Sequence, residues 1–219
     1  MEVYLQRDDR IVVVTGACEQ HGYVSLLADI RVPVAIAEAA CARENVVIAP
    51  PLSFGVSPYF AAYPGTISLR PETFAIVVRE ILEELFRQGF KRILMSNGHG
   101  GNTGVLSPLI VETNNAHPDA RVALFEWWRH PVVNAVAEAE GLAQHHANWS
   151  ENFPGLTRTV LAPEGAKQPV RLPPGTSAAV TRALLGDGSF GGVYQAADAV
   201  MDRFFAAAVD AMVAALRDL

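Results

Sequence analysis

Three short clusters of carboxylates and imidazoles lie far apart in this 219-residue chain and together offer the ligands of a metal site. They are Glu19-Gln20-His21-Gly22 with Asp29, Asn97-Gly98-His99-Gly100-Gly101-Asn102, and His145-His146 with Glu151. Zinc, manganese and iron all accept such ligands. Divalent ions with an open coordination position produce hydroxide from water near neutral pH. The clusters therefore predict a hydrolase, and the number of ligands favours two metals.

The first cluster places two ligand types close together. Glu19 and His21 are two positions apart, so an extended or loop backbone points both side chains the same way. Asp29 begins the next predicted helix, where its charge suits the positive end of the helix dipole. Taken singly, Asp29 could be an ordinary N-cap and His21 a loop histidine. The three residues together favour a site.

His99 stands among glycines directly after a predicted strand. Glycines let the backbone turn sharply and approach other groups closely. A phosphate-binding loop at a helix N-terminus is the alternative interpretation. The order Gly98-His99-Gly100-Gly101-Asn102 matches neither G-x-G-x-x-G nor a P-loop with its lysine. We therefore interpret His99 as a ligand rather than as part of a nucleotide site.

The third cluster is a weak signal by itself, because adjacent histidines are often surface residues. His146 and Glu151 gain weight because the other clusters leave the site short of a ligand and a general acid. The roles of two neighbouring residues stay open. Cys18 could be a nucleophile, although a small buried thiol is commoner, and Trp149 could stack on a flat substrate or belong to the core.

Composition narrows the class of protein. Half of the residues are hydrophobic, only 18% are charged, and the net charge of −6 argues against nucleic acid binding. The two cysteines do not form a disulfide framework, which favours a reducing cytoplasm. The N-terminus is charged and lacks the apolar segment of a signal peptide, and no uncharged apolar run is long enough to span a membrane. We expect a cytoplasmic protein that binds neither nucleic acid nor a membrane.

Strands and helices alternate along most of the chain. We predict strands at 11–15, 45–49, 91–96 and 121–126, helices at 29–44, 71–88, 103–114, 131–140 and 196–219, a loop at 50–68 and irregular structure at 151–195. This order predicts an α/β fold with a mostly parallel sheet, in a single domain over residues 1–219. Ligands of such sheets bind beyond the carboxyl ends of the strands, where the first two clusters fall.

These clusters resemble the motifs of the creatininase family. That family has Glu-Gln-His-Gly followed by Asp, then Asn-Gly-His-Gly-Gly-Asn, then His-Ala-Gly-x-x-Glu, and all three occur here in order, the last imperfectly. The likeness runs from about Val13 to Asn152 and continues weakly to Gly186-Asp187. The resemblance implies a three-layer α/β/α sandwich and a dinuclear centre, commonly of zinc or manganese.

The resemblance also implies a role for each site residue. By motif position, Glu19 and His99 would bind one metal, His21 and Glu151 the other, and Asp29 would bridge them together with a hydroxide. His146 matches the family's proton-transfer residue. Family members are usually homo-oligomers, often hexamers, and hydrolyse C–N bonds in small cyclic or linear amides.

The chain departs from the family pattern around the pocket. Tyr23–Leu26 replaces Pro-His-Leu-Pro and brings Asp29 one residue closer, Asn148 replaces a glycine, Asn152-Phe153 replaces Thr-Ser, and a loop histidine is replaced near Tyr59-Phe60. The ligands remain but the lining differs, which argues against creatinine itself. The leading hypothesis is a metal-dependent amidohydrolase. Alternatives are cleavage of a cyclic ketone, lactone or formamide at the same metal site, and a non-catalytic binding protein on a hydrolase scaffold.

Overall fold

The main sheet has four strands, all parallel, in the computed structural model, which describes residues 1–219. Their order is β2-β1-β3-β4, with β2 at Val47–Ile48, β1 at Arg10–Thr15, β3 at Arg92–Asn97 and β4 at Arg121–Phe125. Each predicted strand is present, although β2 is much shorter than the predicted 45–49. The register pairs Thr15 with Asn97, so β1 and β3 end level with one another.

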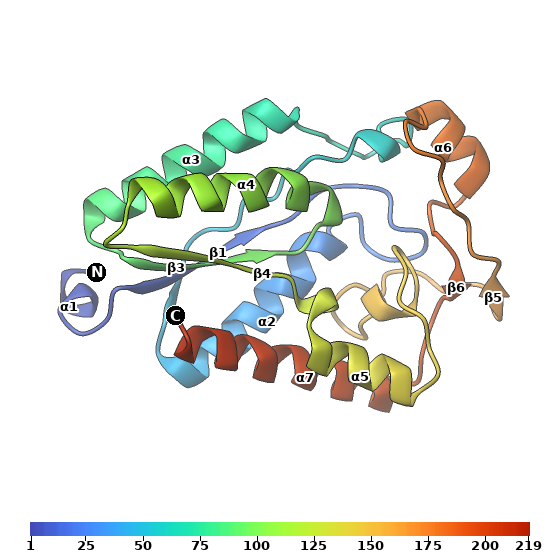
Figure 1. Cartoon of the computed structure of the whole chain (residues 1–219). Helices are drawn as coiled ribbons and strands as arrows, with labels where there is room; N and C mark the ends of the chain where they lie inside the picture. The colour runs from blue at the N-terminus through green and yellow to red at the C-terminus, as the bar shows by residue number, and fades with distance from the viewer.

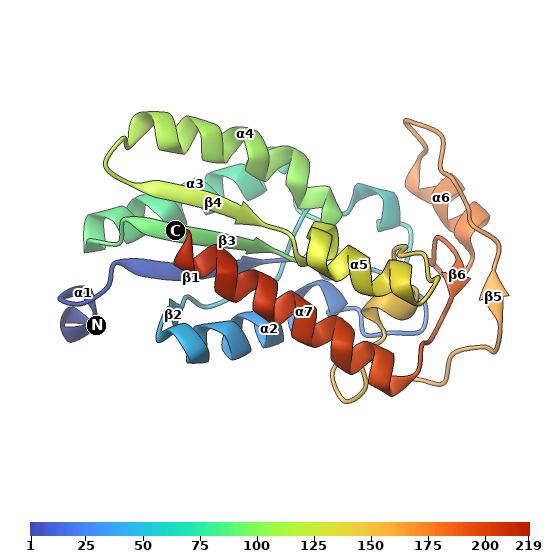
Figure 2. The ribbon, with the colours of Figure 1, turned by 60° about the horizontal axis from the view of Figure 1, so that its bottom comes forward.

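Helices cover both faces of this sheet (Figure 1). On one face lie α3 (Pro71–Gln88) and α4 (Gly100–Ala116); on the other lie α2 (Ala28–Glu44), α5 (Pro131–Ala139) and α7 (Asp198–Arg217). In the turned view of Figure 2, α7 lies in the foreground, with α5 to its upper right and α2 to its lower left. The predicted three-layer α/β/α architecture is confirmed. A short helix at the N-terminus, α1 (Glu2–Leu5), was not predicted.

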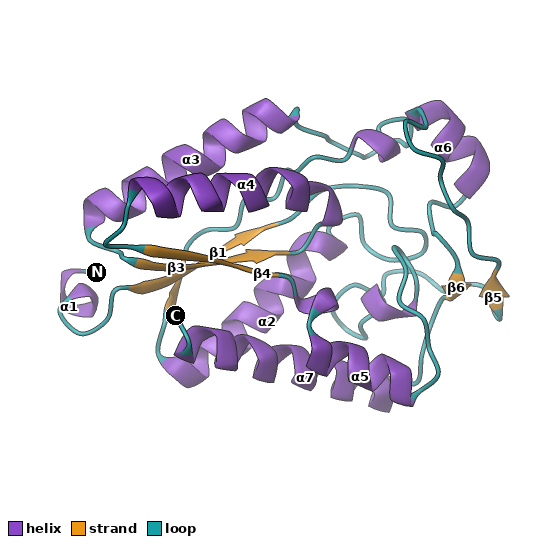
Figure 3. Ribbon diagram, viewed as in Figure 1, coloured by secondary structure: helices purple, strands orange, loops and turns teal.

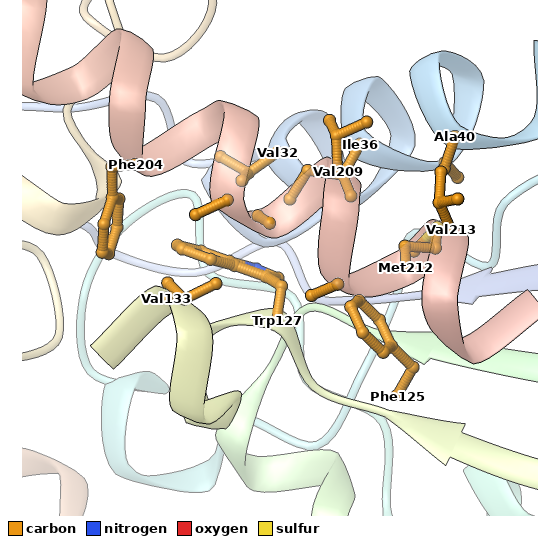
Figure 4. Close-up of a cluster of buried hydrophobic side chains, with 14 of the residues drawn as sticks. Val32, Ile36, Ala40, Phe125, Trp127, Val133, Phe204, Val209, Met212 and Val213 are labelled. Atoms are coloured by element: carbon orange, nitrogen blue, oxygen red, sulfur yellow. The ribbon is translucent and has the colours of Figure 1, made fainter. Parts of the chain in front are cut away.

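Each face of the sheet supports its own hydrophobic core. Successive strand residues point to opposite faces, so Val12 and Val14 join a cluster of 25 buried residues beneath the sheet, and Val13 joins a cluster of 15 above it. Figure 4 shows the first cluster, in which Trp127 packs among side chains of α2, α5 and α7. Because both faces are covered, the strands are continuously apolar rather than alternating.

The long helices lie close to their predicted bounds. The helix α3 begins at Pro71 and ends before Gly89, whose φ of 103° is the left-handed conformation that glycine adopts readily. The helix α4 begins at Gly100, three residues earlier than predicted. Glycine has a low helix propensity, but tertiary contacts outweigh it here, so the glycines after His99 form the first helical turn instead of a loop.

The segment predicted to be irregular contains regular structure. It holds α6 (Ala178–Leu185) and a small antiparallel pair of β5 (Ala166–Lys167) and β6 (Gly192–Val193). Ser177 caps α6 by accepting a hydrogen bond from the Val180 amide. The two strands have two residues each and leave no periodic signal, whereas α6 is amphipathic and was obscured by the prolines of the surrounding segment. With the loops that Figure 3 shows in teal, these elements lie beyond the carboxyl ends of the main strands.

The C-terminal helix α7 packs on the body of the domain. Ten of its 20 residues are buried, and it contacts both α2 and α5. The helix is rich in alanine and other small apolar residues, which allows close packing. None of the helices in the structure combines the length and the apolar character that crossing a membrane requires.

A buried ion pair joins the amino-terminal edge of the sheet to two helix ends. Asp8 accepts hydrogen bonds from Arg10 Nη2 at 2.7 Å and from Arg92 Nη2 at 3.1 Å. Arg10 also donates to the carbonyls of Leu216 in α7 and Glu44 in α2. We expect Asp8→Asn to lower the free energy of unfolding by about 2–4 kcal/mol, because the partly buried Arg10 guanidinium would lose its charged partner. Urea denaturation at neutral pH measures this loss.

The same pair has a predictable pH dependence. Burial raises the pKa of Asp8, but the bonds and charge of Arg10 outweigh it and hold the pKa below the ordinary 3.8. The stabilisation is therefore present above that value and is lost as the pH falls through the lower native pKa. The difference in unfolding free energy between wild type and Asp8→Asn should therefore become smaller in acid. The control Asp119→Asn removes an exposed pair with Lys91 and should lower the free energy of unfolding much less than Asp8→Asn does. Equal losses in both variants would contradict this account.

Candidate metal centre

The structure brings all six predicted site residues together at the carboxyl edge of the sheet. Glu19 and His21 lie in the loop after β1, and His99 directly follows β3. Asp29 lies in the first turn of α2. The level ends of β1 and β3 place their loops side by side, as expected for a parallel sheet. His146 and Glu151 come from a more distant segment.

Two glycines allow Asp29 to reach this position. A Cβ atom at Gly16 would lie 2.1 Å from the Asp29 backbone oxygen, and one at Gly98 would lie 2.0 Å from it. No real side chain tolerates these distances, so only glycine lets the start of α2 press against the ends of both strands. The glycines therefore set the depth of Asp29 in the site.

Asp29 is the centre of the cluster. Its Oδ1 lies 3.1 Å from His21 Nε2, and its Oδ2 lies 2.8 Å from His99 Nδ1. His99 Nδ1 is also 3.4 Å from Glu19 Oε1, and His21 Nε2 is 3.8 Å from Glu151 Oε1. Three groups result, Glu19–Asp29–His99, His21–Asp29–Glu151 and Glu19–His21–His146, and within each the ligand atoms lie within 4.8 Å of one another. The first two share Asp29, and the third includes His146.

Backbone carbonyls orient both histidines. His21 Nδ1 lies 3.1 Å from the Glu19 carbonyl, and His99 Nε2 lies 2.9 Å from the Val56 carbonyl. Each ring therefore donates through one nitrogen and turns the other toward Asp29, which is the usual arrangement of a metal-binding histidine. Asn102 supports His99 indirectly, because its Oδ1 accepts the Val56 amide at 2.9 Å.

Glu151 is held by an unusual backbone conformation. Ala147 has a left-handed φ of 57°, and its amide donates to Glu151 Oε2 at 2.6 Å. Non-glycine residues rarely adopt this φ, and they tend to do so at functional sites. The bond to Oε2 leaves Oε1 facing His21.

His146 lies against the cluster between other rings. Its ring centroid is 4.3 Å from that of His21 and 4.5 Å from that of Phe60, on which it stacks. Its Nδ1 lies 3.5 Å from Glu19 Oε1. Burial and the neighbouring charge of His21 lower the pKa of His146, although Glu19 and Glu151 oppose this. A neutral imidazole therefore faces the cluster at neutral pH.

The buried donor atoms fit divalent cations. Glu19 Oε2, His21 Nε2 and Asp29 Oδ2 are sealed from solvent and have no hydrogen bond of acceptable geometry. Unsatisfied buried groups of this kind are costly. A divalent cation would satisfy such atoms because it binds their lone pairs directly, at distances shorter than those of a hydrogen bond to water. Two groups of ligands with one shared carboxylate suit a pair of ions.

The charge balance agrees with this fit. Burial lowers the pKa of His99, but Glu19 and Asp29 outweigh it and raise the pKa to about 9. Burial also lowers the pKa of His21, but the nearby carboxylates of Asp29 and Glu151 outweigh it and raise this pKa well above the ordinary value. In the metal-free chain, protons on the two imidazoles therefore balance the buried carboxylates, and a divalent cation would displace those protons.

A cavity of about 470 Å³ opens onto the cluster. Five aromatic side chains line it: Tyr59, Phe60, Trp127, Trp128 and Phe190. The polar lining includes Ser57, Gln144, His145 and Ser150, and no lysine or arginine lines the cavity. The motifs did not point to Ser57, Gln144 or Phe190, because each comes from a loop with no distinguishing pattern of its own.

Trp149 and Cys18, whose roles the sequence leaves open, both lie outside the cavity lining. Trp149 is completely buried in the core and donates its indole N–H to the Ala143 carbonyl, so the stacking interpretation is wrong. Cys18 lies outside the cavity lining with its Sγ 3.2 Å from the Gly65 carbonyl. Burial raises the pKa of Cys18, which disfavours the thiolate that a nucleophile needs.

Comparison with known proteins agrees with these features. The family model described as creatininase, creatinine amidohydrolase, matches residues 1–216. The chain belongs to the creatininase family. Creatinine amidohydrolase of Pseudomonas putida is 30% identical over 165 residues, covering 69% of this chain and 62% of that protein. The mycofactocin precursor peptide peptidase of Mycolicibacterium smegmatis is 33% identical over 110 residues, covering 46% and 43%. The matches thus span less than two thirds of both curated relatives.

Solved structures share the fold. A crystal structure of creatinine amidohydrolase superposes with a TM-score of 0.81 at 23% identity, over 99% of this chain and 93% of that one. A structure described as creatininase Mn gives 0.80 at 24% identity, over 99% and 93%. A mutant creatininase described as Zn-Zn type gives 0.78 at 24% identity, over 99% and 94%. The parallel sheet with helices on both faces is therefore the fold of the creatininase structures.

Proposed function

We propose that this creatininase-family chain is a metal-dependent amidohydrolase with a dinuclear centre. Glu19 and His99 would hold one cation, His21 and Glu151 the other, and Asp29 would bridge them. The observation that supports this most is the position of Asp29, whose two oxygens face two different histidines. The ligand types suit zinc, manganese or iron, and the manganese and zinc structures of creatininase favour the first two.

Each part of the site has a chemical task. When bound, a pair of divalent cations supplies Lewis acidity and an activated water at neutral pH. His146 faces the same space with Nδ1, while its Nε2 lies 3.0 Å from the Gln20 carbonyl. Since its imidazole is neutral, Nδ1 would accept a proton from the attacking water and then donate it to the leaving nitrogen of the substrate. The aromatic lining limits the access of bulk water.

The cavity favours a small amide without a carboxylate. Its volume of about 470 Å³ suits a small molecule, and its aromatic walls suit a flat one. The absence of lysine and arginine from the lining leaves no side chain to pair with a carboxylate. This observation favours a cyclic or linear amide over the end of a peptide, although a peptidase is among the relatives.

A substrate panel tests this preference. The panel contains creatinine, other cyclic and linear amides, formamides, lactones, cyclic ketones and short peptides. Turnover of small amides supports the proposal. Turnover of only lactones or ketones would support the alternative chemistry at the same site. Absence of all turnover in protein that holds two metals would favour a binding protein on a hydrolase scaffold.

Glu151→Gln provides the direct test of the second metal position. Because the amide is a much weaker ligand than the carboxylate, we expect one cation per chain to be lost and turnover to fall by about 100-fold or more. Elemental mass spectrometry on protein purified without chelators measures the first effect, and steady-state kinetics the second. The control Glu83→Gln changes a half-exposed carboxylate that pairs with His117. A fully metallated and active Glu151→Gln variant would rule out this ligand assignment.

The assembly and location of the protein are separate proposals. We propose a homo-oligomer, with a hexamer as the first candidate, a cytoplasmic location and a single domain over residues 1–219. Light scattering coupled to size-exclusion chromatography measures the assembly, and a monomer in both metal-loaded and metal-free protein would contradict the first of these proposals.

A further inference from the structure

The tight turn from Gly186 to Phe190 lies outside the ligand set but contacts the segments that carry the site. We propose that Asp187, together with Lys167 and Tyr194, is a positioning group that fixes the imidazole of His146 against the metal centre. The inference rests on the proposed function in one respect, namely that His146 transfers a proton. Its structural part stands on contacts alone.

The Asp187 carboxylate is the centre of a saturated hydrogen-bond network. Its Oδ1 accepts from Lys167 Nζ and from the Ser189 amide, the latter at 2.9 Å, and its Oδ2 accepts from the Tyr194 hydroxyl at 2.6 Å. Lys167 Nζ also donates to the carbonyls of Leu185 and Ser189. All three ammonium hydrogens are thus used. A fully satisfied, half-buried network of this kind rigidifies the turn that it closes.

This turn holds His146 at two points. The Phe190 amide donates to the His146 carbonyl at 3.1 Å. Gln20 Nε2 donates to the Asp187 carbonyl at 2.8 Å, and the Gln20 carbonyl lies 3.0 Å from His146 Nε2. The backbone and the far ring nitrogen of His146 are therefore both tied to groups that the turn fixes. The remaining nitrogen, Nδ1, is left to face Glu19 Oε1.

The turn also delivers an aromatic contact. Phe190 lies 5.4 Å from the ring of His146 and 6.1 Å from that of Phe60, measured between centroids. Gly188 brings the turn close to Gln20, because a Cβ at this position would lie 2.5 Å from Gln20 Cγ and its φ is +94°. Ring packing and backbone contacts thus restrict rotation of the same imidazole.

Two conservative variants test the proposal. Asp187→Asn keeps the shape of the side chain and removes its charge, and Tyr194→Phe removes a single hydroxyl. We expect kcat to fall about tenfold or more in Asp187→Asn and less in Tyr194→Phe, with KM within about threefold and metal content unchanged. The control Tyr63→Phe removes a buried hydroxyl that has no hydrogen-bond partner and should change neither constant.

A second measurement does not depend on turnover. Two-bond ¹H–¹⁵N spectra of the labelled full chain, with and without added zinc, report which nitrogen of His146 carries the proton. We expect one tautomer, protonated at Nε2, in wild type and in Tyr63→Phe, and a mixture or exchange broadening in Asp187→Asn and Tyr194→Phe.

The outcomes separate the two proposals. Unchanged His146 resonances in folded Asp187→Asn would overturn the positioning role. The role would also be overturned if the decrease in kcat were fully accounted for by a loss of metal or of thermal stability. If Asp187→Asn fails to fold, unchanged resonances in Tyr194→Phe would overturn it. If wild type hydrolyses no amide, the proposed function fails, while the spectra still decide whether this network orients His146.

Discussion

Asp29→Asn is expected to abolish binding of both cations and to reduce amide hydrolysis on the order of a thousandfold or more. The reason is geometric, because each carboxylate oxygen of Asp29 faces a different histidine and the residue belongs to both ligand groups. An amide offers one weak acceptor and two donors, and the donors would point at a cation or a protonated imidazole. Metal content should therefore decrease from two ions in wild type to one in Glu151→Gln and to nearly none in Asp29→Asn.

The metal-free protein provides a second expectation for this variant. Without metal, Asp29 is the charged partner of two buried imidazoles, which lower its pKa well below the ordinary value despite burial. The substitution leaves both imidazoles without a charged partner. The free energy of unfolding in urea should therefore be lower for metal-free Asp29→Asn than for metal-free wild type. The control Asp210→Asn changes an exposed aspartate that pairs with Arg43 and should leave metal content and activity as they are. Two bound ions in Asp29→Asn would refute the bridging role.

Gly98→Ala is expected to damage the site although it replaces none of the proposed ligands. The added methyl group would lie 2.0 Å from the Asp29 backbone oxygen and 2.5 Å from Pro33 Cγ. The start of α2 would have to move away from the end of β3, and Asp29 would move with it. We expect a loss of about 3 kcal/mol or more in unfolding free energy, as in severe overpacking, together with loss of at least one cation. Urea denaturation and elemental mass spectrometry measure the two effects.

Neighbouring glycines provide matched controls. Alanine at Gly100 or Gly104 would meet nothing within 4 Å, and both positions lie in α4. Gly104→Ala should stabilise the protein by up to about 1 kcal/mol, because alanine has the higher helix propensity. If Gly98→Ala behaved like Gly104→Ala, the close approach of α2 to β3 would not be what places Asp29.

Much of the fold follows from local patterns in the chain. The helix at Pro71–Gln88 was predicted to the residue, because a clear amphipathic period lies between a proline that suits a first turn and a glycine that suits a C-cap. The helix after His99 was predicted too late, since three of its first five residues are glycines, whose propensity disfavours a helix that packing nevertheless forms. The strands β5 and β6 were missed because two residues carry no period, and α6 was missed because the prolines around it indicated irregular structure.

The residue types and their positions after the strands predict the type of chemistry and the edge of the sheet at which it lies. Carboxylates and imidazoles after two parallel strands specify ligands at one edge, since parallel strands must end on the same side. How these ligands are shared, and which side chains surround them, follows from the packing of the folded chain. The contact of Asp29 with His99 and the link from the Asp187 turn through Gln20 to His146 join residues distant in the chain. Such contacts arise from packing between elements, which no local pattern of residue types encodes.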